Sequence, residues 1–462
     1  MQTKPTSILA VTLTAFAAVL AQSRSVRAAD TNPPIVSSQP AWLTDLSVAD
    51  KESYDDNVLV VSGLGMPEQS SWVNTVTAKV GVDFAPLLAD GPAVQALTLA
   101  YQPEHSDYVN AQSETYTSHK INDLFKGKLG IFSYSLDNAF VYVDGDKLAE
   151  TYALNQLSGA AASQGDKYRN NFTHAVPRER RNQYQDRYNF QLRWDSSSVF
   201  FRPVSSLTYY NLNTYLFNTS KAPYLGYQDY IDRWDVNGGA DLGYKVTSGF
   251  SLLVGYRDGY QHQDPFSLGI NSDQHFSSNH YQRLLFGFEG KLGPWLTVKY
   301  LGGPDYRDYN PDAPIIHDRT TRYYGEGQAT AVLSKNQSLS LTYKQWLFVS
   351  STGLVPYDDI SYALVYHVNL TKQLGFDLGG KYLEANYTLG DDVAGSAPSL
   401  RDDIDYQGSV GFSYLIIPHL TANIGYTYDK GSNGLETLAA TYDPAYRDFE
   451  HGVFSVGLKY GF

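Results

Sequence analysis

Three arginines near the middle of the chain are spaced so that they can act together on one surface. Arg181, Arg187 and Arg193 follow one another at intervals of six residues. Side chains separated by an even number of residues point to the same face of a β-strand, so an extended chain places these guanidinium groups in one row. The alternate positions between them hold Gln183, Gln185, Asn189 and Gln191. Such a polar, cationic row attracts anions and stays in contact with water.

Charged residues with the same alternating placement recur further along the chain. They are Asp235, Asp241, Lys245, Glu289, Glu326, Asp377, Lys381 and Asp405. Positive and negative groups that face each other across a channel create a transverse field, which sorts solutes by charge. We therefore predict that these residues and the three arginines line a pore. The alternative is that any water-filled interior would carry polar and charged side chains in alternation.

The elements that must position these side chains are long strands. Apolar and polar residues alternate from about residue 181 onward, for example over 234–246, which has 13 residues. Strands of soluble sheets usually have about five or six residues. Strands as long as the segment 234–246 cross a bilayer when they are tilted. In a closed barrel their backbone N–H and C=O groups all form hydrogen bonds with neighbouring strands. After the N-terminal 28 residues, the sequence has no apolar run of about 18 residues, the length that a spanning helix needs.

Short and long connections alternate between the strands, which is typical of short periplasmic turns and long exterior loops. Tight turns are expected at 247–249, 293–294, 334–337, 371–373 and 418–419. We place strands at 57–65, 72–86, 93–101, 127–136, 138–144, 180–195, 198–217, 230–246, 249–262, 278–292, 295–307, 319–334, 337–351, 357–371, 374–388, 402–417, 419–431 and 445–462. The predicted fold is all-β, a transmembrane antiparallel up-and-down β-barrel of about 18 strands, or 16 if the first two are something else.

The N-terminus has the layout of a secretory signal peptide. Lys4 precedes an apolar run, and the small residue Ala28 stands before the expected cleavage point. We expect residues 1–28 to be removed, residues 29–56 to form a periplasmic tail, and residues 57–462 to form a barrel in the cell outer membrane.

Composition narrows the possible partners. The chain has no cysteine, so it has neither disulfides nor thiolate metal sites. Its formal charge is −13, and loss of the three cations in the signal peptide would make it −16 (−13 − 3), which argues against nucleic acid. Tyrosine, with 38 residues, suits the interface between membrane and water. No cofactor and no metal are expected.

The last strand carries a candidate assembly signal. Ser455, Gly457, Tyr460 and Phe462 form the outer-membrane pattern of a polar residue, a glycine two positions later and two alternating aromatic residues.

The segment 234–462 resembles the outer-membrane β-barrel porin families, whose bacterial members include many uncharacterised proteins. The resemblance is carried by the hairpin 238–260, the stretch GFEGKLGPWLTVKYLGG at 287–303 with the YRDY that follows at 306–309, and the terminal VGLKYGF. It implies an outer-membrane location, a pore-like role, and recognition of the last strand by the barrel-assembly machinery. It supplies no substrate and no site, and the first 180 residues resemble no family.

The leading functional hypothesis is passive diffusion of small hydrophilic solutes through a pore. The long loop at 145–180 is a candidate for narrowing this pore, and the alternative is that it lies on the surface. The expected partners are outer-membrane lipid, lipopolysaccharide, the barrel-assembly machinery and small hydrophilic solutes, with a homo-oligomer also considered. One alternative is a structural or interaction barrel with a closed lumen, such as an adhesin, a receptor or a secretion partner. Another is an outer-membrane hydrolase that uses exterior histidines: His262, His275, His280 and His317.

Overall fold

Eighteen strands form one closed antiparallel sheet in the computed structural model. The structure describes residues 40–58, 60, 68–88, 93–145, 182–212, 216–217, 227–228, 232–264, 266–267, 274–275, 277–310, 319–349, 356–387, 400–436 and 448–462. The strands of this sheet are β1 (Leu43–Asp55), β2 (Ser71–Asp83), β3 (Ala96–Tyr108), β4 (Tyr116–Leu129), β5 (Phe132–Asp144), β6 (Gln183–Asp195), β7 (Val199–Asn211), β10 (Arg233–Lys245), β11 (Phe250–Gln263), β14 (Asn279–Leu292), β15 (Leu296–Tyr309), β16 (Arg319–Ser334), β17 (Gln337–Phe348), β18 (Tyr357–Asn369), β19 (Leu374–Tyr387), β20 (Leu400–Ile417), β21 (Leu420–Glu436) and β22 (Phe449–Gly461).

Two further ladders have two residues per strand. They join β8 (Leu216–Phe217) to β9 (Tyr227–Gln228) and β12 (Phe266–Ser267) to β13 (Gln274–His275). Two short 3₁₀ helices, Ala85–Leu87 and Gln112–Glu114, lie in connections of the main sheet. Among the residues that the structure describes, no helix combines the length and the hydropathy that crossing a bilayer requires.

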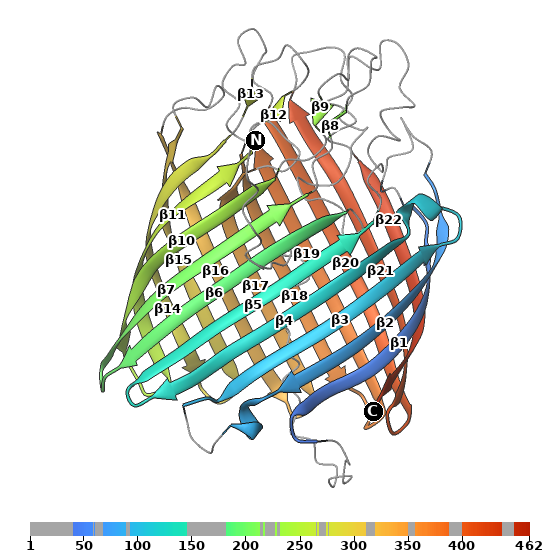
Figure 1. Cartoon of the computed structure of the whole chain (residues 1–462), viewed down its shortest axis with the longest axis horizontal. Coiled ribbons are helices and arrows are strands. Elements are labelled where there is room, and N and C mark those ends of the chain that lie inside the picture. The colour runs from blue at the N-terminus through green and yellow to red at the C-terminus, as the bar shows by residue number, and fades with distance from the viewer. Residues whose placement is uncertain are drawn as a thin grey trace, which may run out of the picture.

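The barrel closes between its first and last strands. β1 pairs with β22 in an antiparallel register that runs from Ser47 opposite Gly461 to Asp55 opposite Val453. Closure leaves no free sheet edge, so the backbone groups of the wall bond to one another as a bilayer requires. Figure 1 shows the tilted strands of this wall from the side, with the C-terminus at the end that carries the short turns. The predicted strand number of 18 is confirmed.

The two faces of the wall differ in polarity as the alternation predicts. Leu242 and Phe286 point outward and are more than half exposed. Their neighbours of opposite parity, such as Asp241 and Leu285, are buried on the inner face. The apolar outer face suits hydrocarbon, and the period of two carries charged residues to the inside. The expected tight turns are also present, and Gly293 takes a φ of 76° in one of them, a conformation that glycine adopts without steric cost.

The barrel begins earlier than predicted, because part of the expected periplasmic tail forms β1. The sequence of β1 hides its alternation, since Asp50 and Glu52 lie on the outer face. The side-chain amide of Asn74 on β2 donates hydrogen bonds to both carboxylates, at 2.9 and 2.7 Å. The expected strand at 57–65 is not one: its described residues lie outside the sheet, and the others are outside the described part of the chain.

The hairpin formed by β4 and β5 also differs from the prediction. The expected strands 127–136 and 138–144 put a turn at Asp137 and Asn138, because these residue types favour turns. The observed turn lies at Gly130 and Ile131, where Gly130 takes a φ of 61°. Both strands are therefore 13 or 14 residues long, and Asp137 faces the interior of the barrel.

Candidate functional site

The interior of the barrel contains a cavity of about 780 Å³. It reaches from residues of β5 and β6 around the wall to β20 and β21. Its described basic lining residues are Arg187, Arg202, Arg233, Arg257, Arg283, Lys299, Lys344 and Lys381. Its described acidic lining residues are Asp137, Asp235, Asp241, Glu326 and Asp359. A lining with this many charged groups is hydrated, because a charge without water or a partner is costly to bury.

Five of the predicted pore-lining residues border this cavity. They are Arg187, Asp235, Asp241, Glu326 and Lys381. Arg193, Lys245 and Glu289 lie in an ion-pair network beside it. Asp377 pairs with His367 on the neighbouring strand at 2.7 Å, and Asp405 is buried on β20. Arg181 and residues 146–180 of the predicted loop lie outside the described residues.

Arg193 forms direct ion pairs with two acids, one of which is the predicted lining residue Glu289. Its guanidinium donates to Asp195 at 2.9 Å and to Glu289 at 2.7 Å. Arg202 bridges the same Glu289, at 2.7 Å, to Asp241, at 2.9 Å. Opposite charges from β6, β7, β10 and β14 therefore meet, and these strands lie within five consecutive strands of the sheet.

Two more cations complete this network. Arg257 contacts the second oxygen of Asp241 at 2.7 Å, and Lys245 contacts Asp195 at 2.8 Å. The network thus joins four basic side chains to three carboxylates (Asp195, Asp241 and Glu289). Its net charge of +1 (4 − 3) leaves the sector slightly cationic.

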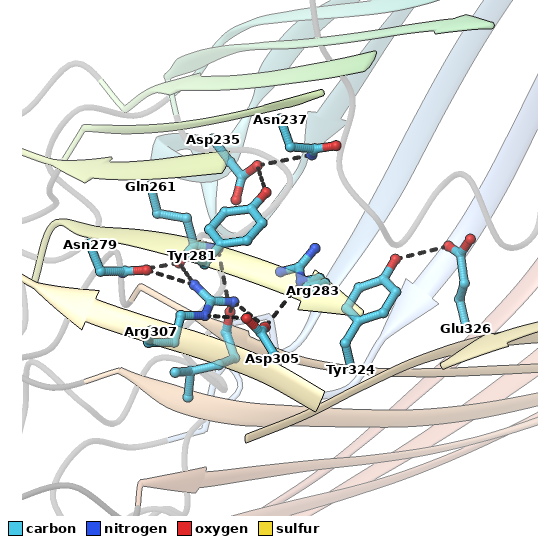
Figure 2. A network of polar contacts seen from close by, with 11 residues as sticks. Asp235, Asn237, Gln261, Asn279, Tyr281, Arg283, Asp305, Arg307, Tyr324 and Glu326 are labelled. Carbon is cyan, nitrogen blue, oxygen red and sulfur yellow. Dashed lines mark hydrogen bonds and ion pairs between the residues drawn. The ribbon is translucent and has the colours of Figure 1, made fainter. Parts of the chain in front are cut away.

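Arg307 is the centre of a second network, which Figure 2 shows. Its Nε and one Nη2 hydrogen go to the carboxylate of Asp305, at 2.9 and 2.7 Å. The Nη1 atom donates to the side-chain oxygens of Gln261 and Asn279, at 2.7 and 2.8 Å. The second Nη2 hydrogen goes to the backbone carbonyl of Leu347, at 3.1 Å. All five guanidinium donors are therefore used, so Arg307 is a fixed structural cation.

Arg283 is held differently, because part of its guanidinium remains unbonded. Its Nε donates to Asp305 at 3.1 Å, and its Cζ lies 4.1 and 4.2 Å from the ring centroids of Tyr281 and Tyr324. The Nη2 atom is buried and has no hydrogen-bond partner among the residues described. Two aromatic rings and one acid thus orient a cation that borders the cavity.

The hairpin of β17 and β18 extends into the lumen at the end of the barrel that carries the long loops. Pairing between β16 and β17 stops at Gly325 opposite Gln345, whereas β17 and β18 remain paired up to Phe348 opposite Tyr357. We call residues 346–349 and 356–359 the β17–β18 tip. Trp346, Tyr357 and Asp359 of this tip line the cavity. The inward element that the structure describes is therefore this tip.

A serine, a histidine and an acid do meet at the exterior rim. His262 contacts Asp264 at 2.9 Å and lies 3.5 Å from the hydroxyl of Ser278. That hydroxyl is buried, accepts from the backbone N–H of Gln263 at 3.0 Å and donates to the Gln263 carbonyl at 3.2 Å. A serine engaged in this way fastens the start of β14 to the end of β11, and the geometry does not poise it as a nucleophile.

The other exterior histidines do not extend this cluster. His280 pairs with Asp258 at 3.0 Å on the outer face. The side chain of His275 and the whole of His317 are outside the described part of the chain. Within that part, no group of three or more histidine and acidic side chains has the geometry of a metal site.

Comparisons with known proteins give similarity at the level of fold. No protein-family model and no curated protein matches the sequence. The fold is similar to OccK2 of Pseudomonas aeruginosa in complex with glucuronate, with a TM-score of 0.41, 10% identity, and coverage of 90% of this chain and 98% of that one. It is also similar to OccAB3 of Acinetobacter baumannii, with a TM-score of 0.39, 11% identity and coverage of 90% and 98%.

A third structure in this group is a variant of the ferric enterobactin receptor PfeA of P. aeruginosa. The TM-score is 0.39 at 8% identity, with coverage of 91% of this chain and 81% of that one. The closed sheet, its apolar outer face and its charged cavity decide the class of this chain on their own. The protein is a closed, 18-stranded transmembrane β-barrel.

Sequence reasoning missed several charged residues inside this barrel. Arg202, Arg257, Arg283 and Lys344 all occupy inward positions on strands that the sequence predicted. The alternation that selected Asp241 and Glu289 would have found them if it had been applied to every strand. Asp305 and Arg307 also occupy inward positions of a predicted strand, 295–307, and were missed in the same way.

The candidate assembly signal of the barrel lies on the closing strand. Ser455, Gly457 and Tyr460 of β22 pair with β1, and the N–H of Phe462 donates to the carbonyl of Leu46 at 2.9 Å. Its recognition by the assembly machinery remains a prediction.

We expect Phe462→Ala to lower the amount of barrel assembled in cells, because the alternating aromatic pattern is lost. Refolding of the purified protein into detergent should change little, since Phe462 is more than half exposed on the outer face. The measurement is the heat-modifiable fraction in outer membranes and after refolding, with Phe454→Ala as the matched control. Equal loss in both experiments would show that Phe462 acts through stability alone.

Proposed function

We propose that this barrel is a passive outer-membrane pore for small hydrophilic solutes and that it favours anions. The observation that carries the proposal is the composition of the cavity lining. Eight basic and five acidic residues give the described lining a net charge of +3 (8 − 5), whereas the whole chain has a charge of −13. A lumen of opposite sign to the protein surface concentrates anions locally.

Arg283 supports this preference through its charge. The rings of Tyr281 and Tyr324 hold its guanidinium group beside the cavity. The residue is buried, so its charge adds to the positive potential of the lumen without direct contact with a solute.

The test is single-channel recording of the refolded protein in a planar bilayer under a salt gradient. Steady openings are expected, with a reversal potential of the sign that anion preference produces. A reversal potential of the opposite sign would reject the charge argument and leave the pore in place.

A closed barrel is the second candidate, because the β17–β18 tip occupies part of the lumen. In that case a folded, heat-modifiable barrel would give no conductance. Such a result would reject the pore and turn attention to the exterior loops as a binding surface.

A further inference from the structure

The β17 side of the β17–β18 tip loses its sheet partner, whereas the β18 side stays paired with β19 as far as Asp358 opposite Asn386. Beyond Gln345, β17 no longer pairs with β16, although β16 itself stays paired with β15 as far as Arg319. Backbone carbonyls that are buried without a partner cost free energy comparable to a lost hydrogen bond. A tip inside the barrel therefore needs donors from elsewhere.

Side chains of other strands of the barrel donate hydrogen bonds to these carbonyl groups. The carbonyl of Leu347 accepts from Arg307 on β15 at 3.1 Å and from Gln261 on β11 at 3.4 Å. The carbonyl of Val349 accepts from Arg233 on β10 at 2.5 Å. The sheet order separates these donor strands from β17 by one strand (β15), three strands (β11) and four strands (β10). The bonds therefore join non-adjacent strands on the inside of the curved wall, and those from Gln261 and Arg233 span part of the lumen.

Apolar side chains also pack against the same tip and hold it in place. Tyr357 forms a buried cluster with Tyr210, Leu212 and Ala385, and Trp346 packs against it. Val349 is 2% exposed. Arg233 contacts the same cluster, since its Cζ lies 4.5 Å from the centroid of the Tyr210 ring.

Arg307 is fixed by the wall independently of the tip. Asp305, Asn279 and Gln261 bind four of the five donors of Arg307, which leaves one donor aimed at the carbonyl of Leu347. A side chain fixed in this way loses little conformational entropy when it forms the last bond. Its charge also strengthens that bond relative to one from a neutral donor.

We propose that Arg307 and Arg233 are positioning residues that fasten the β17–β18 tip across the lumen and so set the width that solutes meet. This inference rests on the proposed pore for its functional consequence. The attachment of the tip is a separate, directly measurable property. Both arginines act on the solute through the position of Trp346 and Tyr357, and Arg233 also contributes its charge to the cavity lining.

The experiment uses a single cysteine at the tip, which is possible because the chain has none of its own. Val349→Cys is reacted with a membrane-impermeant maleimide in the refolded full-length barrel. In the native background the thiol should react slowly. Arg233→Leu and Arg307→Lys should each raise the labelling rate about tenfold or more, as loss of one charge-assisted hydrogen bond implies. The Arg307→Lys change keeps a cation beside Asp305, and Arg233→Leu leaves that network untouched.

Arg319→Leu is the matched control, because Arg319 is an exposed arginine on the same barrel whose ion pair with Asp308 is 3.7 Å long. It should leave both the labelling rate and the conductance unchanged. The two tip variants should also conduct more than the native barrel, which a purely structural role would not produce. Heat modifiability establishes that each variant is folded.

Protection of the thiol in both folded arginine variants would overturn the proposal, and so would rapid labelling in the native barrel. A native barrel without conductance would reject the pore, whereas faster labelling in the variants would still establish the attachment. Conductance that does not change when labelling rises would overturn the claim that the tip sets the width.

Discussion

Asp305→Ala is expected to lower the stability of the barrel by about 3–5 kcal/mol, the cost of leaving a buried charge without its partner. The carboxylate is 0% exposed and accepts from Arg307 at 2.9 and 2.7 Å and from Arg283 at 3.1 Å. Its removal leaves two guanidinium groups next to each other inside the wall. The measurement is the midpoint of urea unfolding in lipid vesicles, followed by loss of heat modifiability.

Asp308→Ala provides the control for this prediction. Asp308 lies three residues further along β15, is exposed, and pairs with Arg319 on the outer rim. A solvent-exposed pair of this kind contributes about 0–1 kcal/mol, so the midpoint should shift little. Equal losses for Asp305→Ala and Asp308→Ala would show that the buried network does not stabilise the barrel.

Reversal of two charges in the cavity is expected to convert an anion-preferring pore into a cation-preferring one. Arg187→Glu combined with Lys344→Glu changes the described lining from +3 to −1 (3 − 4). With each group about 8 Å from a passing ion in a water-like dielectric, each reversal changes the ion's energy by about 1 kcal/mol. That corresponds to roughly a fivefold change in the population of each ion, in opposite directions, and so to roughly a 30-fold change in the anion-to-cation permeability ratio for each substitution. The reversal potential under a salt gradient measures it.

The same charge change outside the lumen is the control. Lys335→Glu combined with Lys372→Glu alters the net charge of the protein equally, but both residues are exposed in short turns between strands. The reversal potential should then stay near the native value, because exposed charges more than about 8–10 Å away are screened at physiological salt. A shift as large as that of the cavity variant would show that selectivity follows net charge and not the lining.

Arg193 shows where sequence reasoning about single residues stopped. Alternation placed it correctly on the inner face, and its charge suggested a free contact for anions. In the structure the charge is balanced by Asp195 and Glu289. The bond to Glu289 joins residues 96 positions apart, so no local pattern could reveal it. Arg187 occupies the same face of the same strand and remains a residue of the cavity lining.

The sequence by itself determined the class of fold, the strand number and the face on which most side chains lie. These properties follow from a period of two along each strand and from the lengths of the turns, which are local. The prediction from sequence failed where local signals were misleading. In β1 the outward-facing acids mask the alternation of polar and apolar residues. In β5 the residues Asp137 and Asn138 are of types that favour turns although they lie within a strand.

Only the tertiary structure decided which charged side chains border the cavity and which are held in ion pairs and hydrogen bonds. Strand tilt and closure bring Arg307, Asp305 and Gln261 to the carbonyl of Leu347, and the departure of the β17–β18 tip from the wall creates the acceptor. Hydrogen-bond partners across a lumen depend on register and curvature summed over many strands, and no window of sequence contains that sum.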